Sequence, residues 1–229
     1  FMDKVGRYGA DAIILDLEDA VPPAEKEAAR QGAVDAIHRW SGQAIYVRIN
    51  PLESRTPYAL AVGLADIAAI TIPGLTGIVA PKMESADDVR SIDAALAEAE
   101  ARHGLEPLSV EIMPLVETAK GIWCCWDVMR ASPRIRRVAF GAIDFARDIA
   151  AMPGTNGHEL LFARSRLVVA SRAAQLAGPV DTVCPALDDM SAVEREARMA
   201  RRLGFGGKMA IHPKQLAPIP VSYTHLRAH

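Results

Sequence analysis

Two carboxylates and one guanidinium stand at the ends of apolar runs, where side chains from distant segments can meet and do chemistry. Glu117 closes the run 110–116, Asp144 closes the run 138–143, and Arg48 lies near the end of the run 44–49. In a parallel α/β protein, residues just past the carboxyl ends of the strands face one shared mouth and can converge on one ligand. The pattern therefore predicts a catalytic rim.

The two acids, Glu117 and Asp144, predict a magnesium site. Mg²⁺ demands an octahedral set of oxygen ligands and gives up its waters reluctantly, so two carboxylates with waters completing the shell suit it. Either acid alone would more simply be a helix N-cap or a first-turn charge where a strand turns into a helix. Their joint occurrence favours the metal interpretation.

Arg48 lies inside an otherwise apolar run, where an unpaired guanidinium would be costly to bury. Its fork could bind a substrate carboxylate or a developing enolate oxygen, or it could form a buried pair with Asp16 or Glu18. The sequence leaves both interpretations open. Asp16, Glu18 and Asp19 place three acids at one predicted strand end, and Lys82 closes another. We predict that these four residues support the site by charge pairing.

Other polar residues are assigned binding or structural roles. His212 is expected to end the last strand, where its imidazole could act as an acid or base or could hydrogen-bond the backbone. We favour a binding role over a chemical one. Arg164, Arg166 and Arg172 lie on an amphipathic helical segment, where contact with solvent or pairing between helices is expected.

Alternating strands and helices must position these residues. Short apolar runs of the kind buried in a parallel sheet predict seven strands, at 12–17, 44–49, 77–80, 108–116, 137–140, 180–184 and 208–211. Helical patterns mark 25–40, 85–103, 159–176 and 191–203. The repeat indicates an α/β fold, either a (β/α)8 barrel of the TIM type that lacks one strand or an open doubly wound sheet. We favour the barrel, because the candidate residues follow several strands and no glycine-rich phosphate loop occurs.

Composition excludes several classes of protein. The chain has 229 residues, half of them apolar, and a formal net charge of −2, which fits one α/β domain. Scattered Lys and Arg residues give no footprint for nucleic acid or for an anionic membrane surface. No apolar stretch is long enough to span a bilayer, and no signal segment is evident. A cytoplasmic protein is expected.

Both ends of the chain depart from a complete barrel. A lone seven-stranded barrel would leave two unpaired edges, so a strand is expected to be missing before residue 1. We assign residues 1–218 to an incomplete barrel domain. Residues 219–229 show no apolar period, and we expect a foreign or disordered tail without function.

Six segments at predicted strand ends carry a resemblance to a known family. They are GADAIILDLEDAV at 9–21, VRINP at 47–51, APKMES at 80–85, LVETA at 115–119, FGAID at 140–144 and AIHP at 210–213. In this order they resemble the citrate lyase beta subunit-like branch of the HpcH/HpaI aldolase family. The resemblance spans nearly the whole chain, to about Pro218.

The resemblance implies a TIM-type barrel that cleaves or forms a carbon–carbon bond beside a CoA thioester. Its substrates would be of the citryl-CoA, malyl-CoA or citramalyl-CoA type, and the products an acyl-CoA and a small oxo acid. Magnesium is the ion implied. Glu117 and Asp144 match the metal ligands, and Arg48 matches the substrate-binding arginine. Mg²⁺ chelated by the oxo acid would polarise the C–O bond while a nearby cation spreads the enolate charge.

The resemblance also implies contacts with the substrate and with other subunits. Backbone around Ile143 and Asp144 is expected to meet the substrate, and Lys4, Ile211 and His212 to help hold the CoA ester. The family tends to form trimers or hexamers, so a homo-oligomer is expected. The family's first strand and its C-terminal lid, which often brings an acid to a neighbouring site, have no counterpart here. We therefore expect a fragment of a longer enzyme whose own activity is in doubt.

Two other functions stay open. A class II pyruvate aldolase of the HpcH/HpaI type would chelate an oxo acid between Glu117 and Asp144 without CoA. A non-catalytic subunit could keep the fold and bind CoA esters or partner chains. The presence of Arg48 beside the two acids speaks against the non-catalytic subunit.

Overall fold

Seven short parallel strands form one sheet in the order of the sequence. The computed structural model describes residues 8–40, 42–52, 57–152, 154 and 156–219. Within them, each strand pairs in parallel with the next. The strands are β1 (Ala12–Asp16), β2 (Ala44–Arg48), β3 (Gly77–Ala80), β4 (Glu111–Val116), β5 (Ala139–Phe140), β6 (Val180–Asp181) and β7 (Gly207–Lys208). The seven expected strands are confirmed. The doubly wound alternative is wrong, because it requires the strand order to reverse.

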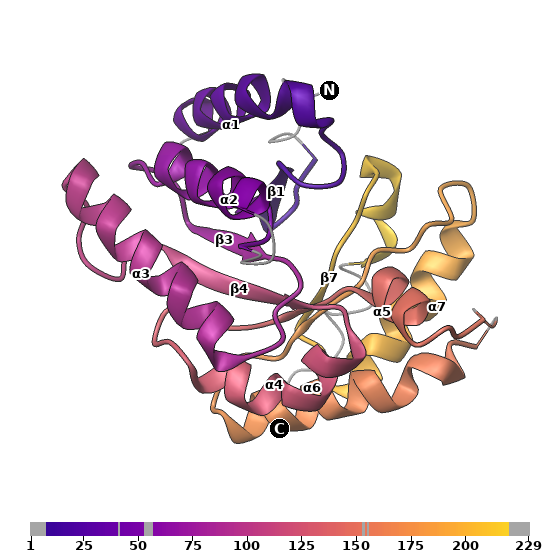
Figure 1. Ribbon diagram of the computed structural model, residues 1–229. Coiled ribbons are helices and arrows are strands. Elements are labelled where there is room, and N and C mark those ends of the chain that lie inside the picture. The colour runs from indigo at the N-terminus through magenta and orange to yellow at the C-terminus, as the bar shows by residue number, and fades with distance from the viewer. Residues whose placement is uncertain (1–7, 41, 53–56, 153, 155, 220–229) are drawn as a thin grey trace.

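The helices lie around the outside of the curled sheet (Figure 1). They are α1 (Lys26–Arg39), α2 (Pro57–Ile70), α3 (Ala86–His103), α4 (Ala119–Arg130), α5 (Ala142–Asp148), α6 (Leu161–Ala173) and α7 (Met190–Leu203). The four helices predicted from the sequence are present, with ends shifted by a few residues. None of the described helices is long and apolar enough to cross a membrane.

Helix α3 shows how local sequence sets the element boundaries. Ser85 begins it, and the Ser85 hydroxyl accepts a hydrogen bond from the backbone N–H of Asp88 at 3.2 Å. Gly104 ends it in the left-handed conformation, with φ 66°, which glycine adopts without steric cost. Ile92 and Leu96 lie on one side of the helix and are fully buried. Caps and an apolar stripe together explain why this helix is the best predicted one.

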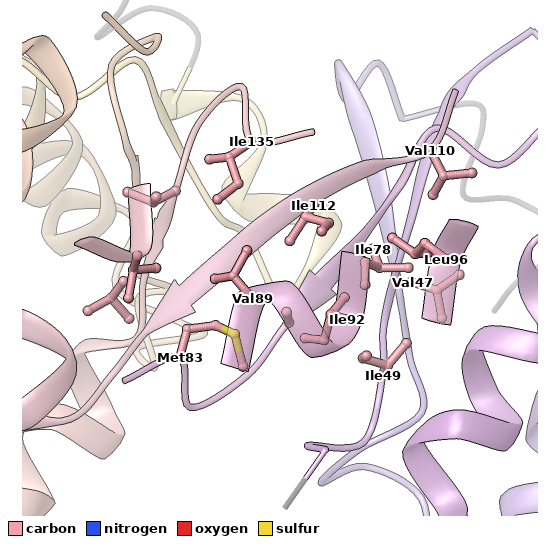
Figure 2. Packing of buried hydrophobic residues seen from close by; sticks show 14 of the residues in the cluster. Val47, Ile49, Ile78, Met83, Val89, Ile92, Leu96, Val110, Ile112 and Ile135 are labelled. Atoms are coloured by element: carbon pink, nitrogen blue, oxygen red, sulfur yellow. The ribbon is translucent and has the colours of Figure 1, made fainter. Parts of the chain in front are cut away.

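The alternation of side chains along the strands places the two faces of the sheet in different hydrophobic clusters, and a third cluster packs Cys184 and Ile219 against α7. One lies between the sheet and the helices, and Figure 2 shows Val47 and Ile78 of the strands in it together with Ile92 and Leu96 of α3. The other covers the opposite, concave side of the sheet with Tyr46, Val79, Met113, Leu115 and Ala139. Successive side chains of a strand point to opposite faces. Arg48 therefore shares the concave side with Tyr46, and Glu117 shares it with Leu115.

Candidate active site

Arg48 is paired with acids at the carboxyl ends of β1 and β2. Asp16 and Arg48 are the last residues of these strands and lie opposite each other in the register. Arg48 donates from Nε to Asp16 Oδ1 at 2.8 Å and from Nη2 to Asp16 Oδ2 at 2.6 Å. Although burial opposes ionisation, these hydrogen bonds hold the pKa of Asp16 below its ordinary value. Of the two interpretations that the sequence left open, the acid pair is the one observed.

Glu18 extends this cluster into the interior. Its side chain lies within 2.9 Å of Arg48 Nη1 through Oε2 and within 3.9 Å of Lys82 Nζ through Oε1. Oε2 is buried, yet the close approach of Arg48 has no hydrogen-bonding geometry, so this oxygen accepts no hydrogen bond within the described structure. Burial raises the pKa of Glu18 to about 7, although the charges of Arg48 and Lys82 oppose the rise. Asp19 lies further out, exposed, with Oδ2 at 3.6 Å from Arg48 Nη1.

Glu117 follows β4 directly and is 3% exposed. Burial first, and then the negative charges of Glu18 and Asp144, raise the pKa of Glu117 to about 8. The carboxylate is held by one backbone group, because Oε1 accepts a hydrogen bond from the N–H of Lys82 at 3.0 Å. Gly141 leaves room for it, since a Cβ at this position would lie 2.6 Å from Glu117 Oε2. The chain thus accommodates a buried acid that is costly to ionise.

Lys82 acts on two acids through two different groups. Its N–H binds Glu117, and its ammonium lies near Glu18. Its backbone is left-handed, with φ 54°, which is uncommon for a residue with a side chain and is found at sites that constrain the backbone. The N–H that binds Glu117 therefore belongs to a residue with an uncommon backbone conformation.

Asp144 lies past the end of β5, in the first turn of α5, which is the position that the sequence offered as the simpler alternative to a metal ligand. Its carboxylate is partly exposed and accepts a hydrogen bond at 2.8 Å from Nη1 of Arg147. Its charge contributes to the raised pKa of Glu117, so the two acids interact electrostatically. Ile143 beside it is 44% exposed. A shared metal ion stays a prediction.

The donor chemistry of this rim fits Mg²⁺ better than a metal that needs a closed protein shell. No group of three or more His, Cys, Asp and Glu side chains suited to a metal occurs among the described residues. Mg²⁺ usually takes one or two carboxylates and keeps several waters. Glu117 and Asp144 offer that number of ligands, and the cost of ionising Glu117 is one that a divalent cation would offset.

Of the residues predicted to hold the CoA ester, Ile211 and His212 follow β7, and one lies outside the described residues. β7 ends at Lys208, so His212 does not end the last strand, contrary to expectation. Its Nδ1 accepts a hydrogen bond from the N–H of Lys214 at 3.1 Å and so caps the short turn Pro213–Gln215. Ile211 is 51% exposed. Lys4 lies outside the described residues.

A buried charge network behind the rim was missed from the sequence. Arg164 was expected to contact solvent or a neighbouring helix, but it is 2% exposed and donates from Nε and Nη2 to the two oxygens of Asp181 on β6. Lys208 Nζ also approaches Asp181, at 3.4 Å, with its side chain fully buried. An acid within the apolar run 180–184 was the one available signal.

Comparisons with known proteins agree with the motifs. The family model HpcH/HpaI aldolase/citrate lyase matches residues 1–213. A citrate lyase subunit beta-like protein of Deinococcus radiodurans is 33% identical over 93% of this chain and 72% of its own length. The L-malyl-CoA/beta-methylmalyl-CoA lyase of Cereibacter sphaeroides is 32% identical over 94% and 72%, respectively.

A solved structure shares the fold. The citrate lyase beta subunit of Mycobacterium tuberculosis, complexed with oxaloacetate and magnesium, superposes with a TM-score of 0.72 at 27% identity. The match covers 97% of this chain and 93% of that one. The resemblance seen in the six sequence segments is confirmed: the chain belongs to the HpcH/HpaI aldolase/citrate lyase family, in its citrate lyase beta subunit-like branch.

Proposed function

We propose that the protein is a Mg²⁺-dependent carbon–carbon lyase that cleaves a short hydroxyacyl-CoA into an acyl-CoA and an oxo acid. The observation that carries the proposal is the buried Glu117, with its pKa raised to about 8 and Asp144 acting on it. Two relatives support the substrate class, since one is named for malyl-CoA and the other was solved with oxaloacetate and magnesium.

In this proposal Glu117 and Asp144 hold the ion. When bound there, Mg²⁺ would supply a Lewis acid for the oxygens of the oxo acid. Glu117 must give up its proton to act as a ligand, and the N–H of Lys82 stays on its Oε1 and orients the carboxylate. Asp144 would have to exchange its hydrogen bond with Arg147 for the metal shell, which an exposed pair allows at little cost.

Arg48 would stabilise the negative charge that develops on the thioester oxygen as the carbon–carbon bond breaks. Its contacts with Asp16, Glu18 and Asp19 use Nε, Nη1 and one N–H of Nη2. A guanidinium has five N–H groups, so a second N–H of Nη2 remains for a substrate oxygen. Asp16 would then serve to fix the guanidinium plane, and Glu18, Asp19 and Lys82 would balance charge around it.

The remaining assignments are proposals of the same kind. The exposed side chains of Ile143 and Ile211 are available to a thioester, and His212 and Lys4 complete the proposed ester contacts. The sequential parallel order of the strands supports a TIM-type barrel, with residues 1–218 as its domain, and the family model reaches residue 213. We propose a homo-oligomer as well.

The test is to incubate the chain with malyl-CoA, citramalyl-CoA and citryl-CoA, with and without Mg²⁺, and to follow release of the acyl-CoA. We expect cleavage of one thioester that requires Mg²⁺ and is lost in Glu117→Ala and Asp144→Ala. Glu98→Ala, which removes an exposed acid on α3, serves as the matched control.

Two outcomes would overturn the proposal. Condensation of pyruvate with an aldehyde, with all three thioesters intact, would indicate the class II aldolase. Binding of Mg²⁺ and oxaloacetate in calorimetry that is unchanged in Glu117→Ala, without turnover, would indicate a non-catalytic subunit.

A further inference from the structure

The first turn of α5, which carries Asp144, is fastened to the neighbouring strand. The residue that begins this helix, Gly141, has no side chain to cap it. Instead, the N–H of Ala142 donates a hydrogen bond to Oγ1 of Thr182 at 3.2 Å. Thr182 follows β6 directly and is 5% exposed. Because the site is buried, water cannot easily replace the Thr182 hydroxyl as the acceptor for the Ala142 N–H.

Thr182 is itself fixed by a buried amine. Its carbonyl oxygen accepts a hydrogen bond at 2.9 Å from Nζ of Lys208, whose side chain is fully buried. The same Nζ lies 2.9 Å from Glu196 Oε2 and 3.4 Å from Asp181 Oδ2, so its charge is balanced. A buried lysine with two acidic partners and a carbonyl has little freedom to move.

Arg164 of α6 joins the network to β5. Its guanidinium binds both oxygens of Asp181 and lies 5.8 Å from the ring centre of Phe140. Phe140 is the last residue of β5, directly before Gly141. The network therefore fixes the segment leading to α5 from two sides, at Phe140 and at Ala142.

The geometry of this turn matters to both acids of the rim. Asp144 lies in the turn that Ala142 begins. Gly141, just before that turn, packs so closely against Glu117 that a Cβ on Gly141 would lie 2.6 Å from Glu117 Oε2. A displacement of the turn would change the position of Asp144 relative to Glu117. Two carboxylates that share one ion tolerate little such change, because Mg²⁺ requires near-ideal octahedral geometry.

We propose that Thr182, held by Lys208, is a positioning residue that fixes the α5 turn so that Asp144 can share a metal ion with Glu117. This inference rests on the proposed function. It assigns to a residue outside the rim a part in metal affinity, and it gives the buried Lys208 network a purpose beyond packing.

The test compares Thr182→Val, which keeps the shape of the side chain and removes the acceptor, with Thr182→Ser, which keeps the hydroxyl. Mg²⁺ affinity in the presence of oxaloacetate is measured by calorimetry on the full chain. We expect Thr182→Val to raise the Kd at least about tenfold and Thr182→Ser to change it less than about threefold. Thr71→Val is the matched control, since Thr71 is also buried and donates its hydroxyl to the carbonyl of Ile67, in α2.

Wild-type affinity in Thr182→Val, or an equal loss in Thr182→Ser or Thr71→Val, would overturn the proposal. Hydrogen exchange at the Ala142 amide distinguishes failure of the proposed role of Thr182 from failure of the proposed function. If the wild-type chain binds no Mg²⁺, the proposed function fails. In that case, faster exchange of this amide in Thr182→Val alone would still show that Thr182 fixes the first turn of α5. Unchanged exchange would refute that role as well.

Discussion

Neutralising Glu117 should stabilise the fold and abolish metal binding at the same time. The substitution Glu117→Gln keeps the size of the side chain and an oxygen that can accept the hydrogen bond from the N–H of Lys82. It removes the charge that burial, Glu18 and Asp144 disfavour. The variant therefore separates what the carboxylate does for function from what it costs in stability.

The sign of the change in stability with pH follows from which state, folded or unfolded, binds the proton of Glu117. The pKa of Glu117 is raised from 4.5 to about 8, so between these values the folded chain holds a proton that the unfolded chain has released. Stability of the wild type should fall as the pH rises through this window and reach its full penalty above pH 8. One pKa unit corresponds to about 1.4 kcal/mol, which gives an upper bound of about 5 kcal/mol. Because Glu18 titrates over the same range and shares the cost, we expect about 2–4 kcal/mol.

The assay is urea unfolding in a chelator at intervals from pH 5 to pH 9. Glu117→Gln should lie within about 1 kcal/mol of the wild type near pH 5 and exceed it by about 2–4 kcal/mol at pH 9. Saturating Mg²⁺ at pH 9 should restore the wild type and leave the variant unchanged, because only a state that binds the ligand is stabilised by it. Glu98→Gln, at an exposed acid on α3, is the matched control. Parallel curves for wild type and Glu117→Gln would refute the argument from burial.

Substitutions at three further positions test the rim. Arg48→Lys keeps the charge but loses the paired hydrogen bonds to Asp16. The unfolding free energy in urea should therefore fall by about 1–3 kcal/mol, and lyase turnover should fall at least about tenfold. Unchanged turnover contradicts this prediction. Gly141→Ala places a Cβ 2.6 Å from Glu117 Oε2, so the calorimetric Mg²⁺ Kd should rise at least about tenfold, and a wild-type Kd counts against it. Val and Asn at position 82 both remove the ammonium near Glu18, but only Asn tolerates the left-handed backbone found there. The unfolding free energy in urea of Lys82→Val should therefore lie about 1–2 kcal/mol below that of Lys82→Asn, and its Mg²⁺ binding should be weaker; equal behaviour of the two variants excludes the strain argument.

The strands and the concave face were predictable because both depend on local pattern. Apolar runs located all seven strands, and the alternation of side chains puts Arg48 and Glu117 on the side of the sheet away from the helices. Helix α2 was not predicted. Its sequence is apolar on nearly every side, so it lacks the one-sided stripe that marks a surface helix.

The site was predictable only as far as strand ends determine it. Glu117 and Arg48 lie where their strands end. The strand expected at 137–140 ends at Phe140 as β5 does, and Asp144 lies beyond it in the first turn of α5. His212 was misplaced because β7 stops at Lys208 and not at residue 211. Short strands give an apolar run no clear end, and only pairing with neighbours determines where the strand stops.

The sequence could not predict which buried polar residues bind each other, and the reason is a different one. Arg164 reads as a surface arginine on its helix, and nothing local indicates that Asp181 in β6 will bind it. Likewise, Thr182 gains its contact with Ala142 only once β5 and β6 are adjacent. Such contacts depend on tertiary packing, which helical and strand periods do not encode.

The acids of the rim outnumber the bases that can serve them, and this imbalance connects stability with function. Arg48 binds Asp16 with two N–H groups, and among the described residues Glu18 Oε2 has a nearby charge but no hydrogen bond. Within the same part of the chain, Glu117 accepts a hydrogen bond from one backbone N–H and forms no ion pair with a base. Near neutral pH such a rim retains protons, as the raised pKa values of Glu18 and Glu117 indicate. A fold selected for stability alone would replace these acids, since buried charges without partners are costly. In the proposed function, a cation that takes the place of the protons would offset this cost.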